Sequence, residues 1–554
     1  MLSSYLWCMK NLLLAIGLVA VTLSNAQTPV AGRPKLVIGI VVDQMRPDYV
    51  VRFWNKFGNN GFKRIMKEGF NCRNTHYNYA PTYTGPGHAS VYTGTTPAYH
   101  GIAGNDWYDA AAADTVYCTA DTGVRSVGGT GWEGMMSPSR LRTTTITDQL
   151  QLCTQMKSKV VGIALKDRGA ILPVGRSGDA AYWYEGKSGN WITSTWYRND
   201  LPKWVNEFNE RRWPEEYLSK PWKTLLPIET YTESDPDNTP YEAPFSGAVS
   251  PVFPHNLPDL RGTSYDLLRK TPFGNTFTKD FALAAIQGEQ LGADSITDFL
   301  ALSFSSPDYI GHQFGPNSIE VEDNYIRLDR DLADLLNFLD SRVGKGKYLL
   351  FITADHACME NPKHMMEHKL YAGFTNPTAI ADSIKGFLRN EYGTDSYFRC
   401  FINDQVYLNE EKIQTDKRDI CEVEQKIARY ALDHVTGIFE TLTSCHLETE
   451  EYRELYRSRI QKGHFHGRSG NIWLVYAPGW TDRLYGSDGT RGTTHGSPFP
   501  YDAHVPLYWF GWNIPAGNSA DEIQITDIAP TLSLLLNITL PNGCIGKKID
   551  ALVR

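Results

Sequence analysis

The chain has 554 residues, of which 42% are apolar and 21% charged, and its formal net charge is −8 at pH 7. One hydrophobic core rarely organises a chain of this length, so we expect one large domain enlarged by insertions, or two domains. The shortage of Lys and Arg argues against nucleic acid or anionic membranes as partners, since no excess of basic side chains can meet their phosphates. A small anionic substrate is still compatible with this charge, because a local metal centre can outweigh the global charge.

The N-terminus predicts an export signal. Lys10 precedes an apolar run from Leu12 to Leu23, and small residues occupy both specificity positions that end at Ala26. This is the pattern of a secretory signal peptide cleaved after Ala26. The alternative, a membrane anchor, needs roughly 20 apolar residues, and this run is shorter. We therefore expect residues 1–26 to be removed, the mature chain to be secreted or periplasmic, and no stable membrane insertion.

Cysteine usage agrees with an exported protein. Of the nine cysteines, Cys8 alone lies within the predicted signal, which leaves an even number in the mature chain. In an oxidising compartment these allow up to four disulfides. No Cys-x-x-Cys pair is present, so a zinc site built from thiolates is not expected.

Short runs rich in Val, Ile and Leu predict buried parallel strands. In chain order the runs are Lys35–Val42, Val160–Leu165, Phe299–Phe304, Tyr348–Thr353, Ile472–Tyr476 and Val505–Phe510. Helical periodicity lies between them, most clearly at Tyr325, Leu328, Leu332, Leu335 and Leu339. Strands that alternate with helices indicate an α/β fold, with a central, mostly parallel sheet and helices on both faces.

Two long stretches interrupt this alternation within the mature chain, residues 27–554. Residues from about 178 to 278 are crowded with Trp, Tyr, Pro and Gly, and residues from about 361 to 470 are mixed and charged. We interpret both as insertions that together form a cap over the sheet. For the second stretch, ordinary surface elaboration is the alternative.

Polar side chains follow four of the predicted strands. In chain order they are Asp43, the triplet Lys166-Asp167-Arg168, the pair Asp308 and His312, and the pair Asp355 and His356. Ligand sites of open α/β sheets lie outside the carboxyl ends of the strands. One Asp after one strand would indicate only a turn or a helix cap, but four such strand ends predict a single site.

The Asp and His residues predict a metal centre. Asp and His without Cys suit zinc in a catalytic site rather than a structural one. Asp308 and His312 are four residues apart, so on a helical turn both point the same way. Further ligands are available from Asp43, Asp355, His356 and, in a Gly-rich turn, His495. The set predicts two Zn²⁺ ions, which at about 4 Å apart would clamp the attacking and leaving oxygens of an in-line displacement.

Thr84 is the predicted nucleophile. The segment Pro81–Gly94 predicts tight turns that enter a short helix, with Thr84 just before the helix. Backbone N–H groups and the helix dipole favour an anion at that position. Zinc coordination would lower the pKa of the hydroxyl and make it nucleophilic. On this segment alone a helix cap would explain the threonine, and the surrounding metal-binding pattern favours the nucleophile.

Together these motifs resemble the alkaline phosphatase superfamily. The resemblance rests on Tyr83-Thr84-Gly-Pro-Gly-His88, His100-Gly-Ile-Ala-Gly-Asn105-Asp-Trp, Thr494-His495-Gly and Thr526-Asp-Ile-Ala-Pro-Thr531, with the Asp and His pairs above. Within it, Leu165-Lys166-Asp167-Arg168-Gly169 resembles the PafA-type, phosphate-irrepressible alkaline phosphatases. The similarity covers most of the chain from about Lys35 onward, and the insertions least.

The resemblance implies a role for each site residue. One zinc would be held by Asp308, His312 and His495. The second would be held by Asp43, Asp355, His356 and the Thr84 oxygen. Thr84 would become phosphorylated in a phosphothreonine intermediate that water then hydrolyses. The non-bridging phosphoryl oxygens would be bound by Asn105, Lys166 and Arg168. The protein would be a phosphomonoesterase that acts on small-molecule phosphate monoesters.

Three other functions compete with this one. A nucleotide pyrophosphatase/phosphodiesterase shares the metal set and the threonine, but two cations suit a dianionic monoester. On an extended segment Lys166 and Arg168 would both face the phosphoryl group. A sulfatase is disfavoured because no Cys/Ser-x-Pro-x-Arg pattern is present. An inactive exported binding relative is disfavoured because every ligand and the nucleophile are present. The oligomeric state is left open.

Overall fold

A ten-stranded sheet forms the centre of the computed structural model, which describes residues 32–482, 484 and 488–553. In spatial order the strands are β18 (Gly517–Gln524), β2 (Phe70–His76), β17 (His504–Gly511), β10 (Tyr348–Thr353), β1 (Leu36–Val42), β9 (Asp298–Phe304), β6 (Val160–Ala164), β7 (Ala180–Glu185), β8 (Asn190–Ser194) and β5 (Ser126–Val127). The predicted signal peptide, residues 1–26, lies outside the described residues.

The middle of this sheet is parallel. Neighbouring strands β10, β1, β9, β6 and β7 all run the same way, and β17 and β8 flank them in antiparallel orientation. Near their carboxyl ends Val41 of β1 stands between Thr353 and Ser303, so these ends lie at one edge. Every residue of β1, β6, β9 and β10 is buried, which explains their continuous apolar sequences.

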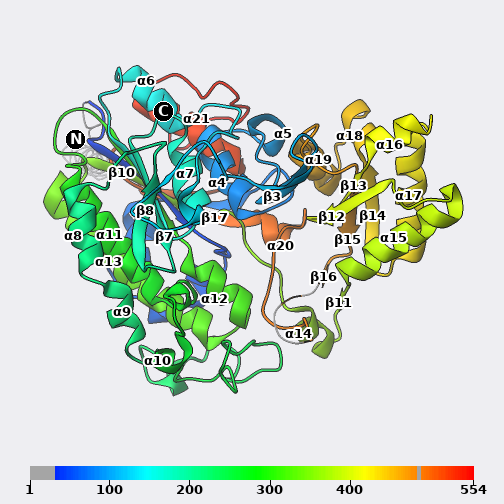
Figure 1. The fold of residues 1–554 in the computed structure, drawn as a ribbon. Helices are drawn as coiled ribbons and strands as arrows, with labels where there is room; N and C mark the ends of the chain where they lie inside the picture. Colours follow the sequence, from blue (N-terminus) through cyan, green and yellow to red (C-terminus); the bar gives the residue numbers. More distant parts are fainter. Residues whose placement is uncertain (1–31, 483, 485–487, 554) are drawn as a thin grey trace, which may run out of the picture. The chain divides into compact units, whose positions relative to one another are not determined.

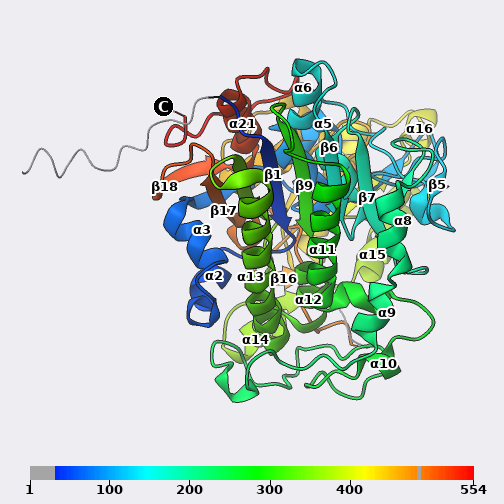
Figure 2. The same cartoon turned by 90° about the vertical axis from the view of Figure 1, so that its left-hand side faces the viewer.

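Helices cover both faces of the sheet, which confirms the predicted fold class. One layer contains α8 (Lys203–Glu210), α11 (Phe273–Gly288) and α13 (Ile319–Leu339), which stand in front of the strands in Figure 2. The other contains α4 (Thr84–Thr93), α6 (Ile146–Cys153), α7 (Asp167–Val174) and α21 (Ile528–Leu536) (Figure 1). The predicted apolar stripe of α13 is buried, and the Ser318 side chain caps its start. Among the described helices none has the length and apolar character that crossing a membrane requires.

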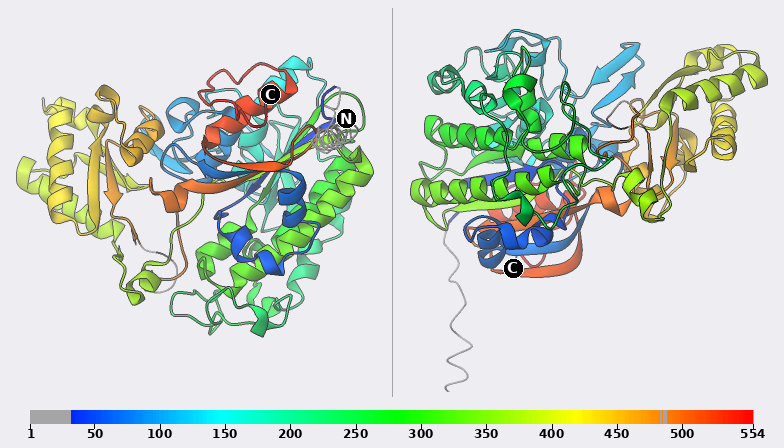
Figure 3. Two further views of the ribbon diagram at one scale, coloured as in Figure 1. Left: turned by 180° about the vertical axis from the view of Figure 1, so that it is seen from behind. Right: turned by 90° about the horizontal axis from the view of Figure 1, so that it is seen from below.

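Residues 377–476 form a smaller unit, here called the inserted unit. Its four-stranded antiparallel sheet has the order β12 (Phe398–Ile402), β13 (Gln405–Leu408), β15 (Ile472–Tyr476) and β14 (Ile438–Thr443). Helices α15 (Pro377–Tyr392) and α17 (Ile420–His434) pack on this sheet around a hydrophobic core of their own. Figure 3 shows the unit, drawn in yellow and orange, beside the central sheet. Cys421 and Cys445 form a disulfide within this unit, so at least one of the up to four disulfides that the cysteine count allows is present.

Three sequence predictions need correction. Ile472–Tyr476 is a strand of the inserted unit and not of the central sheet, and Val505–Phe510 runs antiparallel to β10. The first insertion, expected from about residue 178, starts later, because its first residues form β7 and β8 of the central sheet. A buried apolar run does not specify its neighbour or direction. The Trp and Tyr residues in the first part of this stretch are favourable in strands.

Candidate active site

The carboxyl ends of neighbouring strands bring the predicted ligands together. Asp43 directly follows β1, Lys166 comes two residues after β6, and Asp355 and His356 follow β10 by two and three residues. Asp308 lies in the first turn of α12 (Ser306–Phe314), the helix that begins after β9. All of these side chains are buried. The adjacent strands of the sheet therefore place four chain segments around one point.

Gln44 ties two of these segments together, and nothing in the sequence pattern indicated it. Its backbone N donates to Asp355 Oδ1 at 3.2 Å, and its Nε2 donates to Asp308 Oδ1 at 2.7 Å. The residue adopts a positive φ of 62° directly after Asp43. A Cβ at Gly311 would lie 1.9 Å from Gln44 Oε1, so the glycine in α12 makes room for this contact.

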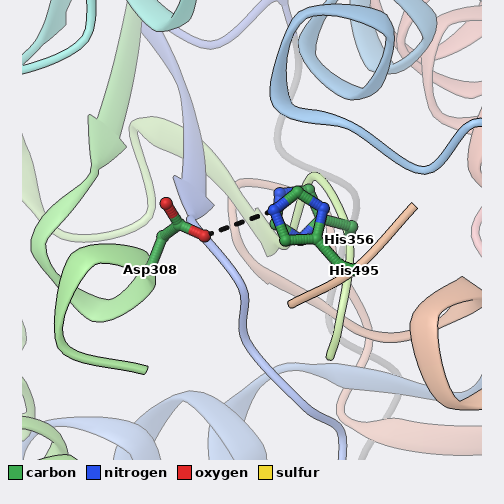
Figure 4. A group of neighbouring side chains, drawn as sticks. All are labelled: Asp308, His356 and His495. Carbon is green, nitrogen blue, oxygen red and sulfur yellow. Dashed lines mark ion pairs between the residues drawn. The ribbon is translucent and has the colours of Figure 1, made fainter. Parts of the chain in front are cut away.

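The acidic and histidine ligand atoms form two overlapping groups. One contains Asp308, His356 and His495, and the other contains Asp43, Asp355 and His356; within each group the ligand atoms lie within 4.8 Å of one another. Figure 4 shows the first group, in which His495 Nε2 lies 3.6 Å from Asp308 Oδ1. The His356 and His495 rings are stacked with centroids 3.4 Å apart. His356 therefore stands between the two groups.

His312 extends the first group along α12. Its Nε2 lies 3.1 Å from Asp308 Oδ1, the oxygen that His495 also approaches. In His312, His356 and His495 alike, Nδ1 faces a backbone carbonyl, respectively that of Thr493 at 2.7 Å, Ala357 at 3.0 Å and Thr82 at 2.7 Å. A carbonyl only accepts, so these contacts place the proton on Nδ1 and leave Nε2 as the ligand atom. Metal-binding histidines are held in the same way.

The buried carboxylates fit divalent cations. Asp43 Oδ1 and Asp355 Oδ2 are buried without a hydrogen-bond partner. Burial and the neighbouring Asp355 raise the pKa of Asp43 well above its ordinary value, and burial raises the pKa of Asp355 to about 6. Lys166 Nζ lies 2.7 Å from Asp43 Oδ2 and 2.6 Å from Asp308 Oδ2, and supplies one positive charge. Three buried carboxylates call for more positive charge than one lysine supplies, so the donor set suits two metal ions.

Thr84 is the first residue of α4 and faces these groups. Its Oγ1 lies 3.5 Å from His356 Nε2, 3.4 Å from Lys166 Nζ and 3.5 Å from Arg168 Nη2. Glycine is needed nearby, because a Cβ at Gly87 would lie 2.4 Å from the Asp355 carbonyl oxygen. The Gly-Pro-Gly motif thus lets the start of α4 approach the strand ends closely, with the threonine at the centre.

The two cations reach Thr84 from a helix start and not from an extended segment. Lys166 precedes α7, and Arg168 lies in its first turn. The Arg168 guanidinium is held from outside α7: Nη1 donates to the Tyr117 hydroxyl at 2.9 Å, and that hydroxyl donates to Asp167 Oδ1 at 2.9 Å. Thr119 also donates to Asp167. Sequence reasoning missed Tyr117 and Thr119, which lie far from Arg168 in the chain and in no recognised motif.

Asn105 joins the site through the nucleophile segment. It precedes β3 (Asp106–Asp109), which forms a hairpin with β4 (Asp114–Tyr117). Its Oδ1 accepts a hydrogen bond from Gly85 N at 2.8 Å, and its carbonyl accepts one from Cys118 N at 2.8 Å. Because Oδ1 is committed to α4, the Nδ2 amide is the group that can donate to a phosphoryl oxygen. Every predicted site residue therefore lies in this one region.

Known proteins resemble the chain over most of its length. A family model described as type I phosphodiesterase / nucleotide pyrophosphatase matches residues 37–498. A protein named calcium-transporting ATPase, from Myroides odoratus, is 46% identical over 94% of this chain and 94% of its own length. Alkaline phosphatase PafA from Elizabethkingia meningoseptica is 42% identical over 98% of this chain and 99% of its own. The crystal structure of wild-type alkaline phosphatase PafA has a TM-score of 0.91 at 43% identity and covers 95% of this chain and 100% of that chain.

These matches include the site as well as the fold. The family model runs from β1 to just beyond His495, so it spans every predicted ligand and the nucleophile. The PafA structure matches at high identity over nearly the whole of both chains. The chain therefore belongs to the type I phosphodiesterase/nucleotide pyrophosphatase family, as one of its PafA-like alkaline phosphatases.

Proposed function

We propose that this alkaline phosphatase hydrolyses phosphate monoesters at a two-zinc centre, through a phosphothreonine at Thr84. The observation that carries the proposal is the position of Thr84 Oγ1, within 3.5 Å of His356 Nε2, Lys166 Nζ and Arg168 Nη2. A phosphoryl group bound at this hydroxyl would meet a ligand histidine and two cations at the same time.

The donor set supports zinc. Asp and His without Cys suit catalytic zinc sites, and Asp43 Oδ1 and Asp355 Oδ2 are buried without a hydrogen-bond partner. One ion would be held by Asp308, His312 and His495. The other would be held by Asp43, Asp355, His356 and the Thr84 oxygen. Bound there, the ions would supply Lewis acidity and lower the pKa of the Thr84 hydroxyl.

The residues of the chain then divide the reaction between them. Thr84 gives its hydroxyl proton to solvent and Oγ1 attacks phosphorus in line. As the new P–O bond forms, the P–O bond to the leaving alkoxide breaks, and the alkoxide takes a proton back from solvent. Asn105, Lys166 and Arg168 bind the non-bridging oxygens, over which a monoester transition state spreads its charge. Water next attacks the phosphothreonine, restores the Thr84 hydroxyl and releases inorganic phosphate.

Phosphodiester hydrolysis is the second candidate, because the description of the matching family includes it. The two cations favour monoesters. A monoester carries two negative charges on its phosphoryl group, whereas a diester carries one and needs space near Lys166 and Arg168 for its second substituent. The name of the Myroides relative indicates ATP as that protein's substrate. The terminal phosphoryl group of ATP is also dianionic. ATP therefore belongs among the substrates tested.

The insertions and the location complete the proposal. Both insertions contact loops of the site: Gly492 N donates to the Tyr241 carbonyl at 2.6 Å, and Asn403 Nδ2 donates to the Asp106 carbonyl at 2.7 Å. These contacts support a cap over the carboxyl edge of the sheet. The sequence pattern ending at Ala26 supports export to the periplasm or the medium, and N-terminal sequencing of the mature protein tests it.

The decisive experiment combines metal removal with trapping of the intermediate. EDTA should abolish hydrolysis of p-nitrophenyl phosphate and Zn²⁺ should restore it. Zinc-loaded enzyme mixed with substrate and quenched at low pH should yield a phosphorylated peptide that contains Thr84. Full activity in exhaustively demetallated protein would disprove the two-metal centre, and phosphate found on another residue would disprove the role of Thr84.

A further inference from the structure

The tip of the inserted unit reaches the loop that carries Asn105. Strands β12 and β13 are joined by the two-residue turn Asn403-Asp404, whose residues have φ values of 53° and 59°. Positive φ at both positions is typical of a type I′ hairpin turn, in which Asn is favoured. Leu474 N donates to the Asp404 carbonyl at 2.8 Å and ties the turn to β15. The turn is therefore a fixed part of the inserted unit.

The Asn403 side chain bonds the residue that follows Asn105. Its Nδ2 donates to the Asp106 carbonyl at 2.7 Å, where β12 approaches β3 (Figure 1). Gly104 precedes Asn105, and a Cβ there would lie 2.7 Å from Asn403 Nδ2. The absence of a side chain at Gly104 therefore leaves room for the Asn403 amide. The amide of Asn403 thus packs against both chain neighbours of Asn105.

The β3–β4 hairpin does not itself hold this carbonyl. Asn105 and Cys118 form a hydrogen-bonded pair, in which Cys118 N donates to the Asn105 carbonyl. Asp106 and Tyr117 are the next pair of the ladder. Hydrogen-bonded and non-hydrogen-bonded pairs alternate in an antiparallel ladder. The Asp106 carbonyl therefore points away from β4 and toward Asn403. Without Asn403 the Asn105 backbone would keep its bond to Cys118 but lose the restraint one residue later.

We infer that Asn403 is a positioning residue for Asn105, supplied by the inserted unit so that the phosphoryl-binding site is completed by a contact across the two sheets. The inference rests on the proposed function, in which Asn105 binds a phosphoryl oxygen. Other contacts between the unit and the hairpin lie farther along it: the Arg468 guanidinium is 5.0 Å from the Trp107 ring, the Arg399 guanidinium is 5.8 Å from the Tyr108 ring, and the Tyr108 and Tyr407 rings are 6.0 Å apart. Asn403 alone among these touches the neighbours of Asn105.

Asn403→Gly tests the inference, because glycine keeps the left-handed turn while it removes the amide. A single neutral hydrogen bond is worth up to about tenfold in a rate or binding constant, so we expect kcat/KM for p-nitrophenyl phosphate to fall about fivefold to tenfold. The inhibition constant for inorganic phosphate should rise by a similar factor. In an Asn105→Ala background the same substitution should cause no further loss. Arg399→Ala, at the same interface, is the matched control and should retain wild-type kcat/KM.

Asn403→Asp gives a second route to the same answer. It preserves the turn but turns an acceptor toward the Asp106 carbonyl, so a loss at least as large as that of Asn403→Gly is expected, with zinc content and thermal unfolding unchanged. Wild-type kinetics in both variants, or equal losses with and without Asn105, would overturn the inference. Wild-type activity of Asn105→Ala would instead overturn the role of Asn105 in the proposed function, which keeps the two failures distinct.

Discussion

The Tyr117 hydroxyl lies 2.9 Å from Arg168 Nη1 and accepts its hydrogen bond. The same hydroxyl donates a hydrogen bond to Asp167 Oδ1. Asp167, which lies between Lys166 and Arg168 in the chain, therefore positions Arg168 through Tyr117. Thr119 holds the other oxygen of Asp167. This arrangement fixes a guanidinium whose Nη2 lies 3.5 Å from Thr84 Oγ1.

Tyr117→Phe should lower kcat/KM for monoesters about fivefold, because a phenyl ring cannot accept from Arg168 and the lost hydrogen bond is worth roughly 1 kcal/mol. The measurement is kcat/KM for p-nitrophenyl phosphate in wild type, in the variant and in both forms combined with Arg168→Ala. Tyr108→Phe, on the paired strand of the same hairpin, is the control. An equal loss with and without Arg168 would show that Tyr117 supports the hairpin in general.

Lys166→Ala and Arg168→Ala should reduce monoester hydrolysis more than diester hydrolysis. A charge-assisted hydrogen bond is worth roughly 1.5–3 kcal/mol, or about one to two powers of ten in rate. A diester offers one negative charge to the two cations and so depends on them less. The measurement is the ratio of kcat/KM for p-nitrophenyl phosphate to that for its bis ester. A ratio unchanged by either substitution would favour the phosphodiesterase reading.

Asp308→Ala and His356→Ala should each lose activity by several powers of ten and bind less zinc. Asp308 belongs to one ligand group, and His356 contributes to both. Zinc content by elemental analysis, measured beside kcat, separates loss of metal from loss of fold. His368→Ala, an exposed histidine in the segment after α14 (Pro362–Glu367), is the control. Full zinc content together with wild-type turnover in Asp308→Ala would contradict its assignment as a ligand.

Much of the site could be predicted because ligand chemistry follows strand ends. Asp43, Asp308 and Asp355 each come directly or a few residues after an apolar run, and parallel strands carry such positions to one edge. Strand partners were harder. Nothing in the run Ile472–Tyr476 shows that it pairs with β13 and β14 and not with the central sheet. Partner choice depends on the packing of the whole chain, which periodicity does not contain.

The supporting residues of the site were out of reach for the same reason. Gln44, Tyr117 and Asn403 each act through one or two hydrogen bonds to residues distant in the chain. Polar residues in such positions are also common in ordinary turns and strands, so their type carries no signal. The sequence predicts that Lys166 and Arg168 lie on an extended segment, and this is wrong for Arg168, which lies in the first turn of helix α7. Both still reach Thr84, because the helix starts at the strand end.

Stability should respond to pH through Asp331 in α13. Burial raises the pKa of Asp331 to about 7 despite Lys279 nearby and a hydrogen bond from Thr276. A carboxyl whose folded pKa lies above its unfolded value of 3.8 favours the fold at low pH and loses that contribution as pH rises through about 7. Asp331→Asn removes this pH-dependent loss of stability, because the amide does not ionise, and its Oδ1 can still accept the hydrogen bond from the Thr276 hydroxyl.

We therefore expect Asp331→Asn to match wild type below about pH 4 and to exceed its free energy of unfolding above pH 7 by at least about 1 kcal/mol, since a tenfold change in a protonation equilibrium corresponds to about 1.4 kcal/mol. Urea unfolding of the zinc-loaded protein across this range measures the difference. Asp334→Asn, on the exposed side of the same helix, is the control. A constant difference between variant and wild type at every pH would contradict the role of burial.

Thr84 tests the central claim most directly, because it separates covalent catalysis from direct attack by water. Its hydroxyl stands at the start of α4 beside His356, Lys166 and Arg168. The measurement is kcat/KM for p-nitrophenyl phosphate in wild type, Thr84→Ser and Thr84→Ala, each with zinc content verified. We predict that Thr84→Ser keeps a substantial part of the activity and that Thr84→Ala loses nearly all of it. Wild-type turnover by zinc-loaded Thr84→Ala would show that the threonine only begins a helix.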